Sequence, residues 1–323
     1  MRAAQLSSYG DPVANVTFVN IPEPPAPKSG EVLVGMEFAP VNPADLLLAM
    51  GYYAVKPTLP SIIGNEGVGK VIAIGPGVVN VKVGDRVAAP LSSFTWRERL
   101  VLPALGLVSL PVEADPKQLA MIAVNPVTAQ LLLSEFKALK PGDWVLQTAA
   151  NSGVGRSVVA FAKERGLKTV NIVRRQELAT ELSAYGADAV VVEGPALHDQ
   201  VKAAVGGADI KLALDCISGP SMVALASLLS SGGALVSYGA MSGSPVTVGP
   251  GDLIYKGLTL TGFFLGHPHH SDKIPELIRA AATLIVRGKL HVPVAALYPL
   301  SSVKDAIAHA RKGGKVLLDI NAS

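Results

Sequence analysis

A turn rich in small residues, Ala-Ala-Asn-Ser-Gly-Val-Gly at 149–155, separates an apolar run from a helical pattern at 152–166. Small side chains let a pyrophosphate approach the backbone, and the N-terminus of the following helix offers N–H donors and a partial positive charge. The match to the dinucleotide fingerprint G-x-G-x-x-G is partial, because Ala150 and Ser152 replace the first two glycines and only Gly155 is in register. A tight strand–helix turn in any α/β protein looks similar, but the place of this turn in the first β-α-β unit favours a dinucleotide site.

Two arginines, Arg174 and Arg175, end the next apolar run. A site for NAD usually has an Asp or Glu about 20 residues after the glycine turn, where the carboxylate binds the ribose hydroxyls. Two guanidinium groups at that position would instead attract a 2′-phosphate, by charge and by paired hydrogen bonds. The alternative is a solvated arginine pair at the end of a strand. Within this pattern we predict NADPH as the cofactor.

Residues that could bind a metal are sparse. The only cysteine, Cys216, excludes an internal disulfide and a zinc site built on several thiolates, and it indicates a reducing compartment. Three histidines cluster in His-Pro-His-His at 267–270, but no carboxylate or thiol has ligand spacing to them, so we interpret this segment as a solvated loop. We predict no metal.

The elements that must position these residues change in type along the chain. Short apolar runs at 31–39, 68–75 and 84–90 alternate with turns and predict a small β-barrel, interrupted by a helix at 43–50. From about residue 115, strand and helix patterns alternate, which predicts a parallel, doubly wound α/β sheet. We predict that 1–118 and 266–323 form one domain and that 119–265 form a dinucleotide-binding domain inserted into it.

Composition limits the classes of function. The chain has 323 residues, of which 49% are hydrophobic and 16% charged, as expected of two globular domains. The net charge of +3 is small and dispersed, which argues against a nucleic-acid partner. The most apolar long stretch, 222–241, is broken by Ser-Ser-Gly-Gly at 230–233, and the N-terminal residues lack the apolar core of a signal peptide. We therefore expect no membrane association and a cytoplasmic protein.

Taken together, these features resemble the medium-chain dehydrogenase/reductase superfamily over essentially the whole chain. The resemblance implies a Rossmann doubly wound parallel sheet inserted into a GroES-like β-barrel catalytic domain. Zinc-dependent members carry a Gly-His-Glu segment, whereas the matching segment here is Gly-Asn-Glu-Gly at 64–67, with Asn65 in place of the metal-binding histidine. The resemblance thus implies the zinc-free branch and a structural role for Glu66.

Within that branch, several motifs are similar to those of the 2-enoyl thioester reductases. They are Asn-Pro-Ala-Asp at 42–45, Gly-Tyr-Tyr at 51–53, Gly-Asn-Glu-Gly-Val at 64–68, Thr-Trp at 95–96, Val-Asn-Pro at 124–126, Asn-Ser-Gly-Val-Gly at 151–155 and Tyr-Gly-Ala-Met at 238–241. The Asn-Ser-Gly-Val-Gly turn and the Asn-Glu-Gly segment are the more specific, since the related quinone reductases more usually have an Ala/Gly-rich turn and a His or Tyr in place of Asn65.

The resemblance also implies site residues. The catalytic tyrosine falls on Tyr53, whose phenol, with an ordinary pKa near ~10, can donate a proton at neutral pH. Tyr52 is the neighbour that could be confused with it, and an aromatic pair that only closes a helix is the alternative without chemistry. Substrate contacts fall on Tyr53, Trp96 and Asn125. The implied cofactor contacts are Asn125, Asn151, Ser152, Gly153, Val154, Arg174, Arg175, Tyr238, Gly239, Ala240, Met241, Phe263, Phe264, Leu265 and Lys315.

The implied reaction is the NADPH-dependent reduction of the C2=C3 double bond of a 2-enoyl thioester, carried by CoA or acyl carrier protein. Hydride would add to C3, and Tyr53 or water would protonate C2. Two alternatives stay open: a zinc-independent NADPH:quinone or enone oxidoreductase, and a non-catalytic NADPH-binding protein. We also predict a homodimer, because a long apolar strand at 258–265 on the edge of the sheet invites pairing with a second copy.

Overall fold

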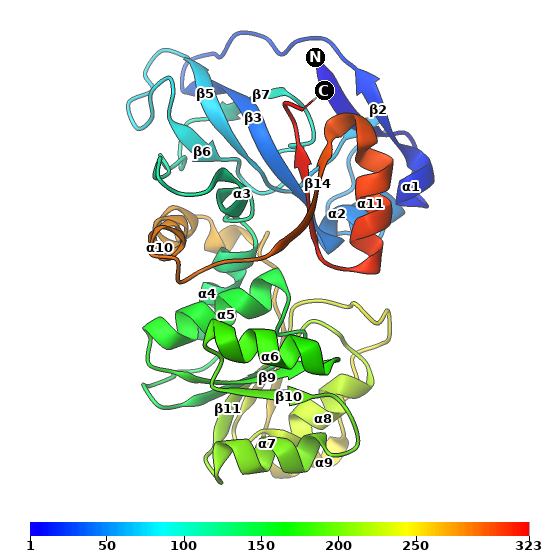
Figure 1. The fold of residues 1–323 in the computed structure, drawn as a ribbon, viewed down its shortest axis with the longest axis vertical. Coiled ribbons are helices and arrows are strands. Elements are labelled where there is room, and N and C mark those ends of the chain that lie inside the picture. The colour runs from blue at the N-terminus through cyan, green and yellow to red at the C-terminus, as the bar shows by residue number, and fades with distance from the viewer. Residues whose placement is uncertain (323) are drawn as a thin grey trace. The chain divides into compact units, whose positions relative to one another are not determined.

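The computed structural model describes residues 1–322 and separates into two compact units. The first unit combines Met1–Val127 with Pro268–Ser323, and the second, Thr128–His267, is inserted between these two segments. Figure 1 shows the chain passing from the first unit through the second and back again. No helix in residues 1–322 has both the length and the apolar character needed to cross a membrane.

The first unit is built mainly from antiparallel strands. Its larger sheet has the order β14-β15-β3-β5-β6, with β7 paired to β3, and a smaller sheet has the order β2-β1-β4. The strands are β1 Arg2–Leu6, β2 Val16–Asn20, β3 Glu31–Val41, β4 Ser61–Ile62, β5 Val68–Ile74, β6 Arg86–Ala88, β7 Arg99–Pro103, β14 Val294–Pro299 and β15 Lys315–Asp319. In β3 the burial alternates along the strand, because successive side chains point to opposite faces. Its inward-facing Val32, Val34 and Met36 join the core of this unit.

Short helices close the first unit. They are α1 Pro12–Asn15, α2 Pro43–Met50, α3 Pro116–Leu119, α10 Ile274–Val286 and α11 Val303–Lys312, with 3₁₀ turns η1 Pro268–His270 and η2 Leu300–Ser302. The helix predicted at 43–50 is confirmed as α2. Pro43 occupies its first turn, where the missing N–H costs nothing.

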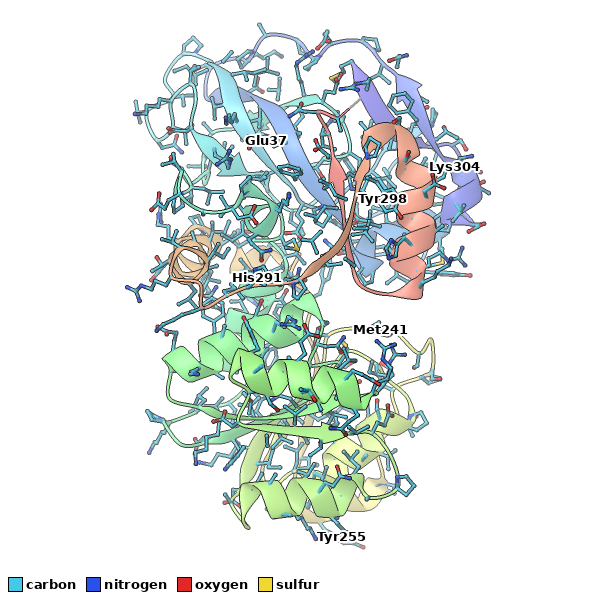
Figure 2. All side chains as sticks on the ribbon, viewed as in Figure 1. Glu37, Met241, Tyr255, His291, Tyr298 and Lys304 are labelled. Carbon is cyan, nitrogen blue, oxygen red and sulfur yellow. The ribbon has the colours of Figure 1, made fainter. Side chains whose placement is uncertain are left out.

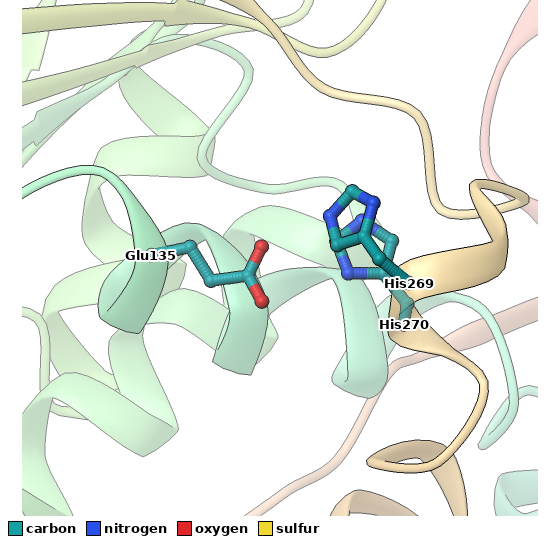
Figure 3. A group of neighbouring side chains, drawn as sticks. All are labelled: Glu135, His269 and His270. Atoms are coloured by element: carbon teal, nitrogen blue, oxygen red, sulfur yellow. The ribbon is translucent and has the colours of Figure 1, made fainter.

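The expected solvated loop at 267–270 needs a correction. Residues 268–270 form a 3₁₀ turn, held by bonds from Ser271 N to Pro268 O and from Lys273 N to His270 O. This turn leaves His269 exposed but directs His270 inward, where only 2% of it is exposed. The two imidazole rings lie against each other with centroids 3.8 Å apart (Figure 3).

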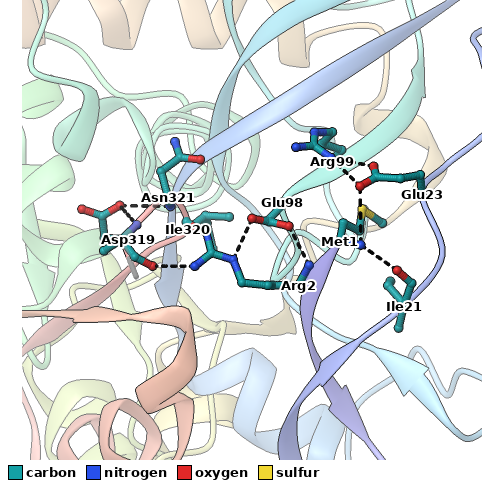
Figure 4. Close-up of polar contacts among 10 residues, drawn as sticks. Met1, Arg2, Ile21, Glu23, Glu98, Arg99, Asp319, Ile320 and Asn321 are labelled. Carbon is teal, nitrogen blue, oxygen red and sulfur yellow. Dashed lines mark hydrogen bonds and ion pairs between the residues drawn. The ribbon is translucent and has the colours of Figure 1, made fainter.

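The two ends of the chain meet within the first unit. Arg2 Nε donates to Glu98 Oε1 over 2.7 Å, and its guanidinium also reaches the carbonyl oxygens of Ile320 and Ala322 (Figure 4). The amino group of Met1 donates to Ile21 O over 2.7 Å. Strands from both ends of the sequence therefore belong to one body, although 140 residues of the second unit, 128–267, separate them in the chain.

The second unit is a six-stranded parallel sheet with the order β10-β9-β8-β11-β12-β13. In chain order this is 3-2-1-4-5-6, the arrangement of doubly wound dinucleotide-binding folds. The strands are β8 Trp144–Gln147, β9 Lys168–Val173, β10 Ala189–Val192, β11 Ile210–Asp215, β12 Ala234–Ser237 and β13 Thr259–Gly262. The predicted α/β fold, a doubly wound sheet inserted into a barrel-like domain, is confirmed.

Helices cover both faces of this sheet. They are α4 Asn125–Glu135, α5 Gly153–Glu164, α6 Gln176–Tyr185, α7 Leu197–Val205, α8 Pro220–Leu228 and α9 Pro250–Tyr255. Figure 1 shows α5 and α6 on one face and α7 and α8 on the other. The edge strand β13 has only four residues, fewer than the run predicted at 258–265. The pairing of β13 with β12 ends at Gly262.

Candidate active site

The predicted phosphate turn has the geometry that a close backbone approach requires. Ser152 caps α5, and its Oγ accepts a hydrogen bond from Gly155 N over 3.1 Å. A Cβ at position 155 would lie 2.4 Å from Ala150 O, so only glycine lets helix and strand come this close. Ala149 adopts a φ of +46°, which is uncommon for a residue with a side chain. Asn151 is exposed, while Gly153 and Val154 form the first turn of α5, where helix N–H groups have no partner within the helix.

Arg174 and Arg175 lie at the end of the second strand of the parallel sheet, as their distance from the glycine turn predicts. Arg174 follows β9, and Arg175 is the residue preceding α6. Both side chains are exposed, and neither forms an ion pair or hydrogen bond within residues 1–322. Two free guanidinium groups beside a helix N-terminus suit an anionic phosphate group.

A buried arginine ties these two parts of the second unit together. The Arg156 side chain in α5 is 4% exposed and forms an ion pair with Glu181 in α6. Its guanidinium also lies 5.1 Å from the centre of the Tyr185 ring. The start of α5 and the second half of α6 are thereby fixed relative to each other.

The end of β11 carries a buried polar network that the sequence analysis missed. One oxygen of Asp215 accepts from Thr148 Oγ1 over 2.8 Å, and the other accepts from Ser218 N over 2.7 Å. Ser221 Oγ lies 3.2 Å from the first oxygen. Ser218 has a φ of +68°, so the Asp215 carboxylate holds a strained loop directly after the strand.

The loop after β12 packs on this network. Gly239 allows the contact, since a Cβ there would lie 2.9 Å from Cys216 O, and Met241 N donates to the same oxygen over 3.0 Å. The Tyr238 hydroxyl is buried beside the Cys216 thiol, whose pKa burial raises to about 11. Ala240 is exposed, and so is Met241, which Figure 2 labels.

The last predicted segment of this unit follows β13. Phe263 contacts the edge of Phe136, with ring centroids 6.1 Å apart, and its N–H donates to Ser237 O. Phe264 is partly exposed, whereas Leu265 is 8% exposed and lies in the core. All the predicted cofactor residues of the second unit therefore lie at the carboxyl ends of parallel strands, the edge where doubly wound sheets bind ligands.

In the first unit, the two candidate tyrosines differ sharply. Gly51 ends α2 in the left-handed conformation, with a φ of +83°. Tyr52 is 81% exposed, but Tyr53 is half-buried and packs on the core. Burial and the nearby Asp45 carboxyl raise the pKa of Tyr53, so its hydroxyl keeps its proton at neutral pH. Tyr53, and not the exposed Tyr52, therefore packs on the core close to Asp45.

Next to Tyr53 lies a buried network that joins distant segments. Asn42 Nδ2 donates to Glu66 Oε1 over 2.8 Å, and Lys315 Nζ donates to Asn42 Oδ1 over 2.6 Å. The second oxygen of Glu66 accepts from Val124 N over 2.9 Å. The network thus fixes the starts of α2, α4 and β15 relative to one another.

The charges in this network are strongly affected by burial. Asp45 accepts from Asn42 N and from Asn65 N, over 2.8 and 2.7 Å, yet burial raises its pKa to about 7. Burial likewise raises the pKa of Glu66 to about 7, against the opposing effect of Lys315. Burial lowers the pKa of Lys315. The role of Glu66 here is structural, because protein donors occupy both of its oxygens.

Two further predicted residues lie in the first unit. Asn125 begins α4, is 6% exposed, and its Nδ2 meets no acceptor within residues 1–322. Trp96 is fully buried in the core, and its Nε1 donates to Pro40 O over 3.2 Å. The structure therefore places the Trp96 ring where it supports the site by packing, not where a substrate would touch it.

The residues around Asn65 do not fit a zinc ion. An amide replaces the imidazole, and its Oδ1 accepts from Ser92 Oγ. Both oxygens of Glu66 have protein donors, and Cys216 belongs to the second unit, after β11. Zinc needs several nitrogen, sulfur or oxygen ligands that are free to coordinate it. No step of the chemistry is therefore assigned to zinc.

Comparisons with known proteins agree with this architecture. Residues 28–100 match the alcohol dehydrogenase GroES-like domain, and residues 153–283 match the family described as zinc-binding dehydrogenase. The human mitochondrial enoyl-[acyl-carrier-protein] reductase is 36% identical over 321 residues, covering 97% of this chain and 86% of the relative. The protein of the same name from Caenorhabditis elegans is 40% identical over 273 residues, covering 83% and 78%.

The chain belongs to the enoyl-[acyl-carrier-protein] reductase family, within the medium-chain dehydrogenase/reductase superfamily. The predicted resemblance is thereby confirmed. Solved structures of this superfamily superpose on the whole chain. An Etr1p complex with NADP and crotonyl-CoA has a TM-score of 0.87 at 27% identity and covers 98% of this chain and 99% of that one. An NADPH:quinone reductase structure from Bacillus thuringiensis has a TM-score of 0.90 at 28% identity, with 98% of each chain covered.

Sequence reasoning missed several residues of the buried networks described above. Asn42 and Asp45 were noted only as part of a shared motif, and Thr148, Asp215 and Ser92 were not noted at all. An Asn followed three residues later by an acid, just before an apolar helix, is a capping signal that could have singled out Asn42 and Asp45. No local pattern indicates the partners of Asp215.

Proposed function

We propose that this chain is an NADPH-dependent reductase of the C2=C3 double bond of 2-enoyl thioesters. The observation that carries the proposal is the placement of the tyrosines, because Tyr53 packs on the core close to Asp45, while Tyr52 is exposed to solvent. The relatives named enoyl-[acyl-carrier-protein] reductase and the complex that holds NADP and crotonyl-CoA support the same substrate class.

NADPH fits the residues of the second unit. Residues 151–154 offer helix amides to the pyrophosphate, and Arg174 and Arg175 offer unpaired guanidinium groups to the 2′-phosphate. The loops after β12 and β13, with residues 238–241 and 263–265, would contact the nicotinamide half, and Lys315 would contact the cofactor from the first unit. When bound, NADPH supplies the hydride that adds to C3.

The residues of the chain then stabilise the developing negative charge and supply the proton. As the C3–H bond forms, the π electrons shift toward the thioester oxygen, and hydrogen-bond donors must stabilise the negative charge that develops there. The Tyr53 hydroxyl gives its proton to C2, and solvent returns a proton to the tyrosinate. Asn125, with its free Nδ2, would help to orient the substrate. One hydride and one proton are consumed for each double bond reduced.

A quinone or enone reductase is the second candidate. It is favoured by the Bacillus thuringiensis structure and by a mycobacterial quinone oxidoreductase with a TM-score of 0.85 at 28% identity. The two functions are separated by measuring NADPH oxidation with crotonyl-CoA and with a 1,4-quinone. The proposal predicts a much higher kcat/KM for crotonyl-CoA, and the opposite order would favour the quinone reductase. NADPH binding without turnover of either substrate would indicate a non-catalytic protein.

We extend the proposal to partners and location. The acyl group would arrive as a thioester of CoA or acyl carrier protein, the chain would act as a homodimer, and nucleic acid and membranes would not be partners. We propose a cytoplasmic location, since the one cysteine is buried and needs no oxidising compartment. The curated relatives carry the word mitochondrial in their names, so fractionation of the source cells decides between the two compartments.

A further inference from the structure

Tyr53 lies in an extended segment, residues 51–60, which we call the tyrosine loop. The loop runs from Gly51, which ends α2, to the residue before β4. Exposure alternates along it, so that Tyr53 and the other odd-numbered residues face inward while the even-numbered residues face solvent. Within residues 1–322 the loop belongs to no sheet. It therefore lacks the ladder of backbone bonds that would hold a strand of this shape in place.

Tyr9 contacts the tyrosine loop at two points. Its Oη donates to Pro57 O over 2.7 Å. In the described part of the chain, this is the one hydrogen bond to the backbone of residues 54–59. The Tyr9 ring lies against Gly51, since a Cβ at that position would be 3.4 Å from Tyr9 Cβ and Cγ. One side chain thus contacts the loop on both sides of Tyr53 along the chain.

Tyr9 is itself held by the elements that flank the loop. The next residue, Gly10, donates its N–H to Ala49 O in the last turn of α2, over 3.0 Å. On the other side of Tyr9, β1 pairs with β4, with Leu6 opposite Ser61. The segment around Tyr9 is therefore attached both to the helix that precedes the loop and to the strand that follows it.

We propose that Tyr9 is a positioning residue, whose ring and hydroxyl hold the tyrosine loop so that the Tyr53 hydroxyl is oriented for proton transfer. This inference rests on the proposed function, in which Tyr53 gives its proton to C2 of the enoyl thioester. Tyr9 acts through Gly51 and Pro57 and needs no contact with the substrate. Proton transfer requires a donor in the right place and direction, and a small displacement of a reacting group slows a reaction considerably.

The test is a double-mutant cycle on crotonyl-CoA turnover. Tyr9→Phe keeps the ring against Gly51 and removes only the bond to Pro57 O. Tyr9 is 36% exposed, so the loss of its hydroxyl leaves no buried carbonyl and the variant should fold. Since a neutral hydrogen bond corresponds to a change of roughly 3–10-fold, we expect kcat to fall by about this factor, with KM and NADPH affinity unchanged. In the Tyr53→Phe background, Tyr9→Phe should have no further effect, because the hydroxyl that Tyr9 positions is gone.

Tyr298→Phe is the matched control in the same unit. The Tyr298 hydroxyl shares a hydrogen bond with His309 Nδ1 over 3.1 Å, between β14 and α11 and outside the tyrosine loop. Its removal should lower the melting temperature without changing kcat. The solvent deuterium isotope effect on kcat should rise in Tyr9→Phe, where slower proton transfer limits turnover more strongly, and should keep its wild-type value in Tyr298→Phe.

Two results would overturn the proposal. One is a wild-type kcat in Tyr9→Phe. The other is an equal loss of kcat from Tyr9→Phe in the wild-type and Tyr53→Phe backgrounds, which would mean that Tyr9 supports the fold in general and not the proton donor. Failure of wild type to reduce any enoyl thioester would instead refute the proposed function itself.

Discussion

Lys315 Nζ lies 2.6 Å from Asn42 Oδ1, so the first residue of the last strand binds the residue that precedes α2. Asn42 in turn donates a hydrogen bond to Glu66, and Glu66 accepts a second hydrogen bond from Val124 N. One ammonium group faces two buried carboxyls, Asp45 and Glu66, and its charge cannot balance both. This imbalance makes the stability of the protein depend on pH.

We predict that the free energy of unfolding falls as pH rises from about 4.5 to about 7. Burial raises the pKa of Glu66 from 4.5 to about 7, and that of Asp45 from 3.8 to about 7. Between these values the folded chain binds more protons than the unfolded chain, so a rise in pH favours unfolding, and the effect ends above the folded pKa. Glu66→Gln removes one titrating group and should make the decline smaller, by roughly 1–3 kcal/mol. Urea unfolding at several pH values gives the slope of the free energy of unfolding against pH for wild type and for Glu66→Gln. Equal slopes for the two proteins would contradict the prediction.

Cofactor preference should depend on Arg174. Its guanidinium is exposed and forms no ion pair or hydrogen bond within the described residues, so a 2′-phosphate can bind it directly. Arg174→Ala should reduce the preference for NADPH over NADH by about 1–3 kcal/mol, the value of a charged hydrogen bond. Fluorescence titration of both cofactors gives the difference. The exposed Lys168 on the same strand, changed to Ala, is the matched control and should leave the preference unaltered. Equal affinities for the two cofactors in wild type would refute the assignment.

The second unit should associate through its edge strand. β13 pairs with β12 alone within residues 1–322, and Leu260 on this strand is 36% exposed. Tyr255, at the end of α9, is 88% exposed (Figure 2). An uncovered edge with apolar side chains nearby favours pairing with a second copy. Sedimentation should show a dimer for wild type and a monomer for Leu260→Lys, and a monomeric wild type would contradict the prediction.

Removal of metal should leave the activity unchanged. Asn65 offers an amide where the resemblance implies a metal-binding histidine in zinc-dependent relatives, and protein donors occupy the oxygens of Glu66. After exhaustive chelation, NADPH oxidation with crotonyl-CoA should equal that of the untreated protein. The prediction would be contradicted if the purified protein held stoichiometric zinc, lost activity when the zinc was removed, and regained activity when the zinc was restored.

The sequence was informative where function depends on local spacing. The turn at 149–155 and the arginines after β9 occupy the predicted places because a strand, a turn and a helix in succession determine them. The network around Asn42 could not be predicted, since its partner Lys315 is 273 residues away and only the pairing of β15 with β3 brings them together. Trp96 shows a second limit of prediction from sequence motifs. A motif match identifies a residue that matters but not whether it contacts substrate or fills the core.

The most direct test of the central claim is the turnover of crotonyl-CoA by Tyr53→Phe beside Tyr52→Phe. The first change keeps the ring that packs on the core and removes only the hydroxyl, while the second alters an exposed side chain. If Tyr53 protonates C2, kcat of Tyr53→Phe should fall by about 10²–10⁴-fold, with NADPH affinity almost unchanged, and Tyr52→Phe should stay close to wild type. Wild-type turnover by Tyr53→Phe would contradict the account and assign the proton to water or to another group.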